Sequence, residues 1–281
     1  MFEIVSLHPN PQREECFALL PRAAEILKKA GKRLYLREEH RERFAALDGV
    51  EFVPDAVFYS SDLIISFGGD GTILSVSRQA RVYRTPILGV NCGHVGFLTA
   101  FSSEDLSGLS DLSEDKVRIE DRMMLTVSHR GKKYHALNEA CVVSKNSCAI
   151  SEFDVTIDDN FIGHYFADGV IVATSTGSTA YSLSAGGAAV DPRLNCICIT
   201  PICPHSLLRA RPLIEPPTAK VCLSHISSAK SAAVLCIDGR REIDLGEDPV
   251  EIRKSRQVTR LVLPREQNFC NVLYSKFFER N

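Results

Sequence analysis

Apolar runs alternate with helix-period segments over the first hundred residues. Residues 11–30 predict a helix with four apolar side chains along one face and Gly31 as its stop, and a charged helix is predicted around residues 38–47. Short apolar runs predict strands at 2–7, 33–36, 62–67 and 86–90. This alternation is typical of βαβ units. We therefore expect a parallel sheet whose last two strands end in glycine-rich loops at one edge.

The pattern changes beyond residue 100. Residues 101–116 contain five Ser and five acidic residues with little apolar period, and we interpret them as a linker. The chain then becomes mostly β, with hairpin turns predicted at Arg130-Gly131, Asp158-Asp159-Asn160 and Asp238-Gly239. A strand and a final helix from about residue 268 return to the pattern of the first half. The expected domains are an α/β domain over 1–110, joined by about 257–281, and a β-rich domain over 117–256.

Composition narrows the classes of function. The 281 residues include 33 Lys and Arg against 35 Asp and Glu, and the formal charge of -2 argues against nucleic acid or an anionic membrane surface as the main partner. The chain holds ten Cys but begins without a basic and apolar leader, so we expect a reducing, cytoplasmic location. The longest uncharged stretches, 85–103 and 169–190, hold too many polar groups to sit in lipid.

Eleven of the 17 glycines fall in two short regions, 68–96 and 163–187. The first region contains Gly68-Gly69-Asp70-Gly71-Thr72 between a predicted strand and a predicted helix. Backbone N–H groups at such a helix start can bind a phosphate chain. A carboxylate there would repel bare phosphates, so Asp70 fits if it meets a hydroxyl to be phosphorylated or a phosphate-bound metal. A ligand-free Asp-Gly turn would use the same residues.

Three further segments have the residue types of a nucleotide site. The loop over 91–98 follows its strand as the first glycine loop does. In 168–187 a strand enters a hydroxyl-rich turn, where we expect Ser178 as a helix N-cap and Asp168 as an acceptor for sugar or amide donors. Asn138-Glu139 can read adenine or ribose, provided that a bulge or strand end turns both to one ligand. An ordinary loop, a helix cap and an edge strand remain open as alternatives for the three segments.

No protein-held metal site is predicted. Cys196 and Cys198 share a strand face, but no second ligand pair with zinc spacing follows, so we expect core cysteines.

Taken in this order, the motifs resemble those of the NAD kinase family. The matching pieces are 68–72, 91–99, Asn138-Glu139, 168–187, 201–212 and Asp238-Gly239. The glycine-aspartate loop is shared with diacylglycerol-kinase-like and phosphofructokinase-like enzymes. The segment 168–187 and the Asn-Glu pair narrow the resemblance to the NAD kinase family. The resemblance implies the NAD kinase/diacylglycerol kinase-like fold: an α/β amino-terminal domain with a Rossmann-like parallel sheet, and a β-rich second domain.

The resemblance also implies an activity. A phosphoryl group would pass from ATP, another nucleoside triphosphate or polyphosphate to the 2′-hydroxyl of the adenosine ribose of NAD, giving NADP, with Mg²⁺ carried by the donor phosphates. Asp70 would be the catalytic residue that receives or orients the hydroxyl proton. The phosphate-donor loop would comprise Gly68, Gly69, Gly71 and Thr72. NAD would be bound by Gly71, Phe97, Asn138, Glu139, Asp168, Thr179, Ala180, Tyr181, Ser182, Leu183, Ser184 and Arg240.

Assembly as a homodimer or homotetramer is implied as well. The chain departs from the family pattern at Phe166, at the segment 205–212, which is one residue longer, and at Arg240, which replaces a Gln and is expected to meet a phosphate.

Two alternative functions are considered. A lipid kinase of the diacylglycerol or sphingosine type would need an acyl pocket and a membrane-facing element, for which the sequence gives no signal. A non-catalytic nucleotide sensor would keep the nucleotide-binding residues but would not need the catalytic acid, so the intact Asp70 argues against this alternative.

Overall fold

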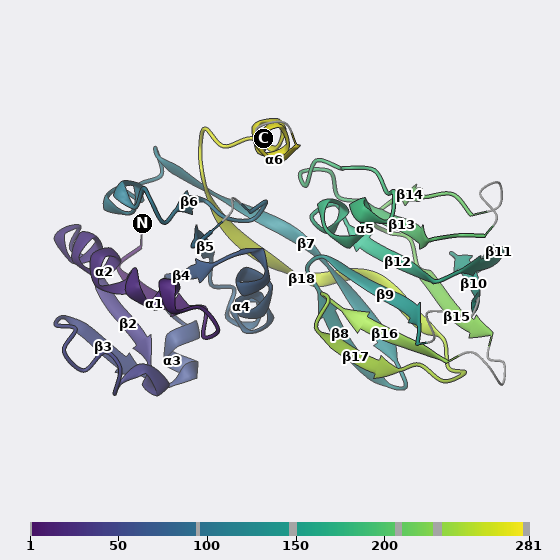
Figure 1. Ribbon diagram of the computed structural model, residues 1–281, viewed down its shortest axis with the longest axis horizontal. Helices are drawn as coiled ribbons and strands as arrows, with labels where there is room; N and C mark the ends of the chain where they lie inside the picture. Colours follow the sequence, from purple (N-terminus) through teal and green to yellow (C-terminus); the bar gives the residue numbers. More distant parts are fainter. Residues whose placement is uncertain (1, 94–95, 146–150, 206–209, 227–231, 278–281) are drawn as a thin grey trace. The chain divides into compact units, whose positions relative to one another are not determined.

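The computed structural model describes residues 2–93, 96–145, 151–205, 210–226 and 232–277. The chain divides into two compact units, one formed by Met1–Asp121 with Thr259–Asn281 and the other by Arg122–Val258. Figure 1 shows helices α1 to α4 beside the parallel strands of the first unit, and the short helix α5 among the antiparallel strands of the second. Among the helices within the described ranges, none is long and apolar enough to cross a membrane.

The first unit is built on a parallel sheet. Its strands are β1 (Ile4–Pro9), β2 (Arg33–Arg37), β3 (Val50–Val53), β4 (Leu63–Gly68), β5 (Ile87–Asn91), the short β6 (Phe101–Ser102) and the end of β18 (Val250–Pro264). Its helices are α1 (Glu14–Ala18), α2 (Leu20–Lys29), α3 (Asp55–Tyr59), α4 (Asp70–Tyr83) and α6 (Phe269–Phe277), with short 3₁₀ segments η1 (Glu38–His40) and η2 (Ser107–Ser110). The parallel order β3-β2-β1-β4-β5-β18 confirms the predicted α/β class. Since β4 and β5 are neighbours, their glycine loops leave the same edge.

The single helix predicted over 11–30 is wrong, because the structure has two helices that meet at Leu19. Pro21 lies in the first turn of α2, where a residue without a backbone N–H is tolerated. Inside one continuous helix its ring would clash with the carbonyl of Phe17, four residues earlier. The predicted apolar face is nevertheless buried in the core of this unit, with Cys16, Phe17, Leu20, Ala23, Ala24 and Leu27.

Two other segments differ from the expectation. Residues 38–47 form only the 3₁₀ turn η1, because His40 and Phe44 are their only fully buried side chains, too small an apolar face to hold a longer helix. Residues 101–116, expected to be a linker, pack into the first unit through Leu106, Leu109 and Leu112. Leucines three residues apart were the signal for this burial, and the serines and acids between them masked it.

The second unit is a sandwich of two antiparallel layers, which confirms the predicted β-rich class. Its strands are β7 (Val117–His129, which begins in the first unit), β8 (Lys132–Ala136), β9 (Glu139–Ser144), β10 (Ser151–Ile157), β11 (Asn160–Ala167), β12 (Gly169–Thr174), β13 (Ile197–Ile202), β14 (Leu213–Glu215), β15 (Val221–Ile226), β16 (Ala233–Ile237), β17 (Arg241–Asp244) and the first part of β18. One layer has the order β14-β13-β12-β9-β16-β17, and the other contains β11-β10-β15-β18 and the pair β7-β8. Two short segments, η3 (Gly177–Thr179) and α5 (Tyr181–Ser184), follow β12.

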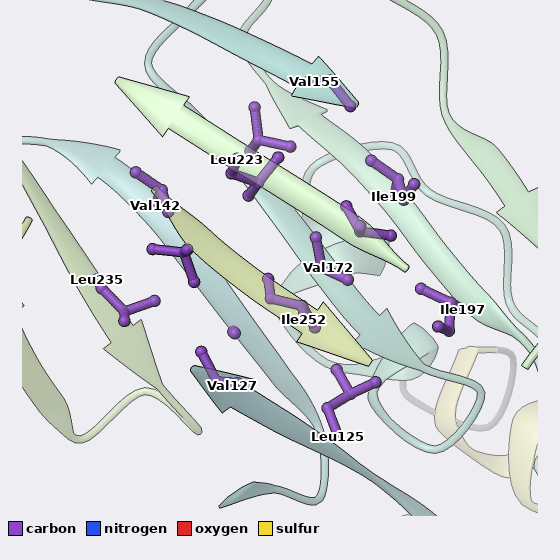
Figure 2. Close-up of a cluster of buried hydrophobic side chains, with 14 of the residues drawn as sticks. Leu125, Val127, Val142, Val155, Val172, Ile197, Ile199, Leu223, Leu235 and Ile252 are labelled. Atoms are coloured by element: carbon purple, nitrogen blue, oxygen red, sulfur yellow. The ribbon is translucent and has the colours of Figure 1, made fainter. Parts of the chain in front are cut away.

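One apolar core joins the two layers. Figure 2 shows side chains from both of them in this cluster, among them Val127, Leu223 and Ile252 from one layer and Val142 and Leu235 from the other. The alternation of buried and exposed residues along β10 is the period-2 pattern of a strand with one face in such a core.

All three predicted hairpins are present. Each turns through two residues with positive φ: Arg130 and Gly131 at 48° and 71°, Asp158 and Asp159 at 49° and 67°, and Asp238 and Gly239 at 48° and 62°. Paired positive φ values suit two-residue turns between right-twisted strands. β8 ends at Ala136, so that Asn138 directly precedes β9 and Glu139 begins it.

Candidate functional site

The predicted phosphate loop forms the junction of β4 and α4. β4 ends at Gly68 and α4 begins at Asp70, so the loop contributes the first turn of a 14-residue helix. The Thr72 hydroxyl accepts a hydrogen bond from the Asn10 side-chain amide at 2.9 Å. A Cβ at Gly68 would lie 2.2 Å from that hydroxyl oxygen, so only glycine fits there. The structure thus places Gly68, Gly69, Asp70, Gly71 and Thr72 together, with open backbone at Gly69.

The Asp70 carboxylate joins this loop to the loop after β5. Its Oδ2 accepts from the Phe97 backbone N–H at 2.9 Å, and its Oδ1 accepts from the Leu98 N–H at 3.0 Å. A Cβ at Gly96 would lie 2.0 Å from Oδ1. Backbone donors that hold a carboxylate in this way fix its orientation more firmly than a mobile side chain could. His94 and Val95 of the same loop lie outside the described residues.

Phe97 is half-buried beside this carboxylate. The Lys276 ammonium of α6 lies 5.5 Å from the centre of the Phe97 ring, a cation–π distance. Sequence reasoning missed Lys276, because nothing in the pattern links a terminal helix to residue 97. The contact puts a cation close to the loops that carry Asp70.

In the second unit, Asp238 organises the Asn138-Glu139 pair. Its carboxylate accepts the backbone N–H groups of Leu137 at 3.1 Å, Asn138 at 2.9 Å and Glu139 at 3.3 Å. Its own N–H donates to the Glu139 carbonyl at 3.0 Å. The strand end between β8 and β9 is therefore held by one buried acid from the turn after β16.

The hydroxyl-rich stretch after β12 packs against the same strand end. The Thr174 hydroxyl donates to the Leu137 carbonyl at 2.7 Å and accepts from the Gly177 N–H at 3.0 Å. A Cβ at Gly177 would lie 2.1 Å from the Asn138 carbonyl oxygen, so this position has room for glycine alone. The structure thus brings the predicted Asn-Glu pair into direct contact with the hydroxyl-rich turn of the segment 168–187.

The expected capping role of Ser178 is wrong. Ser178 lies inside the 3₁₀ turn η3, and its buried hydroxyl donates to the Ser175 carbonyl at 2.7 Å and accepts from the Val190 N–H at 2.9 Å. The four-residue helix α5 begins after Ala180 without a side-chain cap. The hydroxyl serves a contact between segments twelve residues apart, which local spacing does not reveal.

A pocket of about 790 Å³ opens in this unit. Four predicted NAD-binding residues line it, namely Glu139, Asp168, Tyr181 and Arg240. The rest of its wall consists of Cys141, Val143, Ser144, Ile202, Cys203, Cys236, Gly239 and Glu242. Of the other predicted residues, Ser182 is buried with its hydroxyl 2.8 Å from that of Thr200, whereas Thr179, Ala180, Leu183 and Ser184 are partly or fully exposed nearby. Residues 206–209, in the longer segment, lie outside the described residues.

Two buried oxygens of the Asn138-Glu139 pair are unpaired. Within the part of the chain that the structure describes, Asn138 Oδ1 and Glu139 Oε2 have no hydrogen-bond partner. Burial, reinforced by the negative charges of Asp238 and Cys236, raises the pKa of the Glu139 carboxyl to about 8. Glu139 is therefore mostly protonated at neutral pH and can donate as well as accept. Buried polar atoms without partners are costly, so a polar ligand would offset part of that cost.

The raised pKa of Glu139 predicts a pH-dependent stability. Between the ordinary pKa of 4.5 and the raised value of about 8, the folded state keeps a proton that the unfolded chain releases, so the free energy of unfolding falls as pH rises through this range. Glu139→Gln stays neutral and should be more stable than the wild type by roughly 2 to 4 kcal/mol at about pH 9, and similar to it at about pH 4. Urea unfolding at both pH values measures the difference. Parallel pH profiles for the two proteins would contradict the assignment.

Sequence reasoning missed Asp238, Asn10 and the pocket cysteines as site residues. The signal for Asp238 was present as an Asp-Gly turn after an apolar strand, but a turn residue does not reveal that its carboxylate reaches a strand about a hundred residues earlier. Asn10 follows β1 at the edge where the glycine loop also begins, which a topology with β1 beside β4 would have placed.

Comparisons with protein families cover both units. Residues 5–116 match the family described as ATP-NAD kinase N-terminal domain, and residues 137–263 match ATP-NAD kinase C-terminal domain. An NAD kinase of Caldanaerobacter subterraneus subsp. tengcongensis is 38% identical over 232 residues, covering 80% of this chain and 81% of the relative. An NAD kinase of Caldicellulosiruptor bescii is 39% identical over 220 residues, covering 78% and 83%.

Solved structures are similar over nearly the whole chain. A yeast NADH kinase, crystallised with NADH, superposes with a TM-score of 0.80 at 25% identity, covering 100% of this chain and 88% of the yeast one. An NAD kinase from Archaeoglobus fulgidus in complex with ATP gives a TM-score of 0.73 at 25% identity, covering 97% of each chain.

Proposed function

The chain belongs to the NAD kinase family and phosphorylates NAD to NADP with ATP, and from this premise we propose that the acceptor is the 2′-hydroxyl of the adenosine ribose, with Asp70 as its proton acceptor. The observation that carries the proposal is the Asp70 carboxylate, held by the Phe97 and Leu98 amides at the start of α4. A carboxylate fixed in this way has lone pairs left for an incoming hydroxyl.

In the proposed step the 2′-oxygen attacks the terminal phosphorus of the donor. The new O–P bond forms as the bond to the bridging oxygen breaks, ADP leaves, and the hydroxyl proton passes to Asp70. Phosphoryl transfer needs mainly positioning and charge stabilisation, which the backbone N–H groups of Gly69 and Gly71 at the helix start would supply to the donor phosphates.

NAD would occupy the pocket of the second unit. The unpaired oxygens of Asn138 and Glu139 suit the amino group and hydroxyls of adenosine, and the protonated Glu139 could donate to a ring nitrogen. Asp168 and Tyr181 line the same pocket, and the exposed Arg240 would meet a phosphate. We retain Gly71, Phe97 and the segment from Thr179 to Ser184 as NAD contacts on the strength of the resemblance.

Mg²⁺ would arrive with the donor. Bound to the donor phosphates, the ion would supply charge neutralisation, while this chain would bind the phosphates and keep Asp70 oriented. Polyphosphate or another nucleoside triphosphate remains a proposed donor besides ATP. A cytoplasmic location and a homodimer or homotetramer also remain proposals, and light scattering of the purified chain tests the second.

The position of the new phosphate on the product tests the proposed acceptor. Incubation with NAD, ATP and Mg²⁺ should yield a product that an NADP-specific dehydrogenase reduces, and its phosphorus spectrum should match authentic 2′-NADP. The same mixture without Mg²⁺ is the control for the metal, and polyphosphate in place of ATP tests the donor. A product phosphorylated elsewhere, such as at the 3′-oxygen, would overturn the acceptor assignment.

A further inference from the structure

Two free cysteines face each other across adjacent strands in the wall of the pocket. Cys141 on β9 is the direct partner of Cys236 on β16, and both are unbridged. We propose that this pair is a thiol–disulfide modification site, in which a hydroperoxide links Cys141 to Cys236 and thereby changes the pocket. The inference rests on the proposed function only for the ligand of the pocket, NAD.

The register places the two backbones at disulfide distance. The Asp238 N–H donates to the Glu139 carbonyl at 3.0 Å, and the Lys145 N–H donates to the Ala232 carbonyl at 2.7 Å, which marks these residue pairs as hydrogen-bonded. Hydrogen-bonded pairs recur at every second position of an antiparallel ladder, so the cysteine pair is one of them, with its Cα atoms about 5.5 Å apart. Disulfides span Cα separations of about 4.4 to 6.8 Å, so little backbone movement is needed.

The side chains of the pair point to the pocket and away from the sandwich core. Cys141 and Cys236 line the pocket with Glu139 and Val143, whereas their sequence neighbours Val142 and Leu235 lie in the core (Figure 2). Cys141 is 6% exposed and Cys236 is half-buried. A small oxidant can therefore reach Cys236 through the pocket, and a reductant can reach the product by the same route.

The chemistry assigns different roles to the two thiols. A hydrogen bond from the Cys141 thiol lowers the pKa of Cys236, which favours Cys236 as the attacking thiolate. The thiolate displaces hydroxide from the peroxide and becomes a sulfenic acid. The Cys141 sulfur then attacks that sulfur, the S–O bond breaks, and water leaves. Overall the pair loses two electrons and two protons, and the hydroperoxide is reduced to water or an alcohol.

A Cys141–Cys236 disulfide in the wall of the pocket would alter the binding of NAD. Glu139 lies two residues before Cys141 on the same face of β9, and Tyr181 lines the same pocket as both thiols. Linking the sulfurs moves them toward each other and shifts the surface next to these two contacts. Bound NAD should in turn shield Cys236 and slow the oxidation.

Peptide mapping tests the proposal without any turnover. The full chain is treated with hydrogen peroxide, its free thiols are alkylated, and the digest is analysed by mass spectrometry. We expect a protein two hydrogens lighter with a Cys141–Cys236 crosslink, restored by dithiothreitol and slowed by saturating NAD. Affinity for NAD, measured by calorimetry, should be about tenfold weaker in the oxidised form.

Matched variants define the outcome. Cys236→Ser and Cys141→Ala should each abolish the crosslink, whereas Cys203→Ser, which removes the third pocket thiol, should leave it intact. Cys196, directly before β13, and Cys198 on that strand have their sulfurs 3.9 Å apart; they serve as the internal control and should stay reduced. Oxidation to sulfinic acid without a crosslink, or a crosslink through Cys203 instead, would overturn the proposal. Because the crosslink is read by mass, this result is separate from any failure to form NADP.

Discussion

Asp70→Asn is expected to lower kcat by at least about two orders of magnitude while leaving the affinity for NAD nearly unchanged. The amide has almost the shape of the carboxylate but cannot take the hydroxyl proton. Its NH₂ group would also face one of the two backbone N–H donors that the carboxylate now binds, so one contact is lost. Single-turnover kinetics with NAD and ATP, together with calorimetric NAD binding, separate the chemical step from binding.

A surface variant gives the matched control for this loss. Asp48→Asn makes the same chemical change at a fully exposed side chain of the same unit, and its turnover should equal that of the wild type. Near-normal turnover of Asp70→Asn would remove Asp70 from the catalytic role. A parallel loss of NAD affinity would instead make it a binding residue.

Asp238→Ala is expected to lower the free energy of unfolding by about 3 to 5 kcal/mol. The substitution leaves the N–H groups of Leu137, Asn138 and Glu139 without their charged acceptor. It also forces an alanine into the left-handed region, because φ at this position is 48°. Urea unfolding at neutral pH measures the loss.

Asp238→Asn separates the two causes. Asparagine tolerates positive φ and keeps one side-chain oxygen as an acceptor, so its loss should be clearly smaller. It also removes a negative charge that raises the pKa of Glu139, so the Glu139 carboxyl should ionise at lower pH in this variant. If Ala and Asn destabilise equally, or if Ala costs less than about 1 kcal/mol, the three hydrogen bonds do not hold the strand end.

Local patterns predicted the elements that form from neighbouring residues. The strands before the two glycine loops and the three hairpins depend on apolar runs and turn residues, and each appears in the structure. The proximity of the loops also followed from topology, since the neighbouring parallel strands β4 and β5 end at one edge. Asp70 could be singled out because a turn between a strand and a helix rarely needs an acid set among three glycines.

The features that the sequence predicted wrongly, or did not predict, depend mostly on contacts between residues far apart in the chain. Ser178 bonds to Val190 and the Asp238 carboxylate bonds to Asn138, and neither pairing leaves a trace in local spacing. The break between α1 and α2 was readable from Pro21 but was outweighed by the continuous apolar face on both sides of it. The pairing of Cys141 with Cys236 depends on the register of two strands about ninety residues apart, which requires the fold.

The lack of a side chain at Gly96, where the Asp70 carboxylate leaves no room for one, bears on how related sequences are judged. Any side chain there would push the Asp70 carboxylate off the two amides that orient it, since a Cβ would sit 2.0 Å from its Oδ1. A relative that keeps the Gly-Gly-Asp-Gly letters but carries alanine at this position would retain the signature and lose the geometry. Catalytic competence therefore depends on two separate positions along the chain. The missing Cβ at Gly96 matters as much as the carboxylate of Asp70.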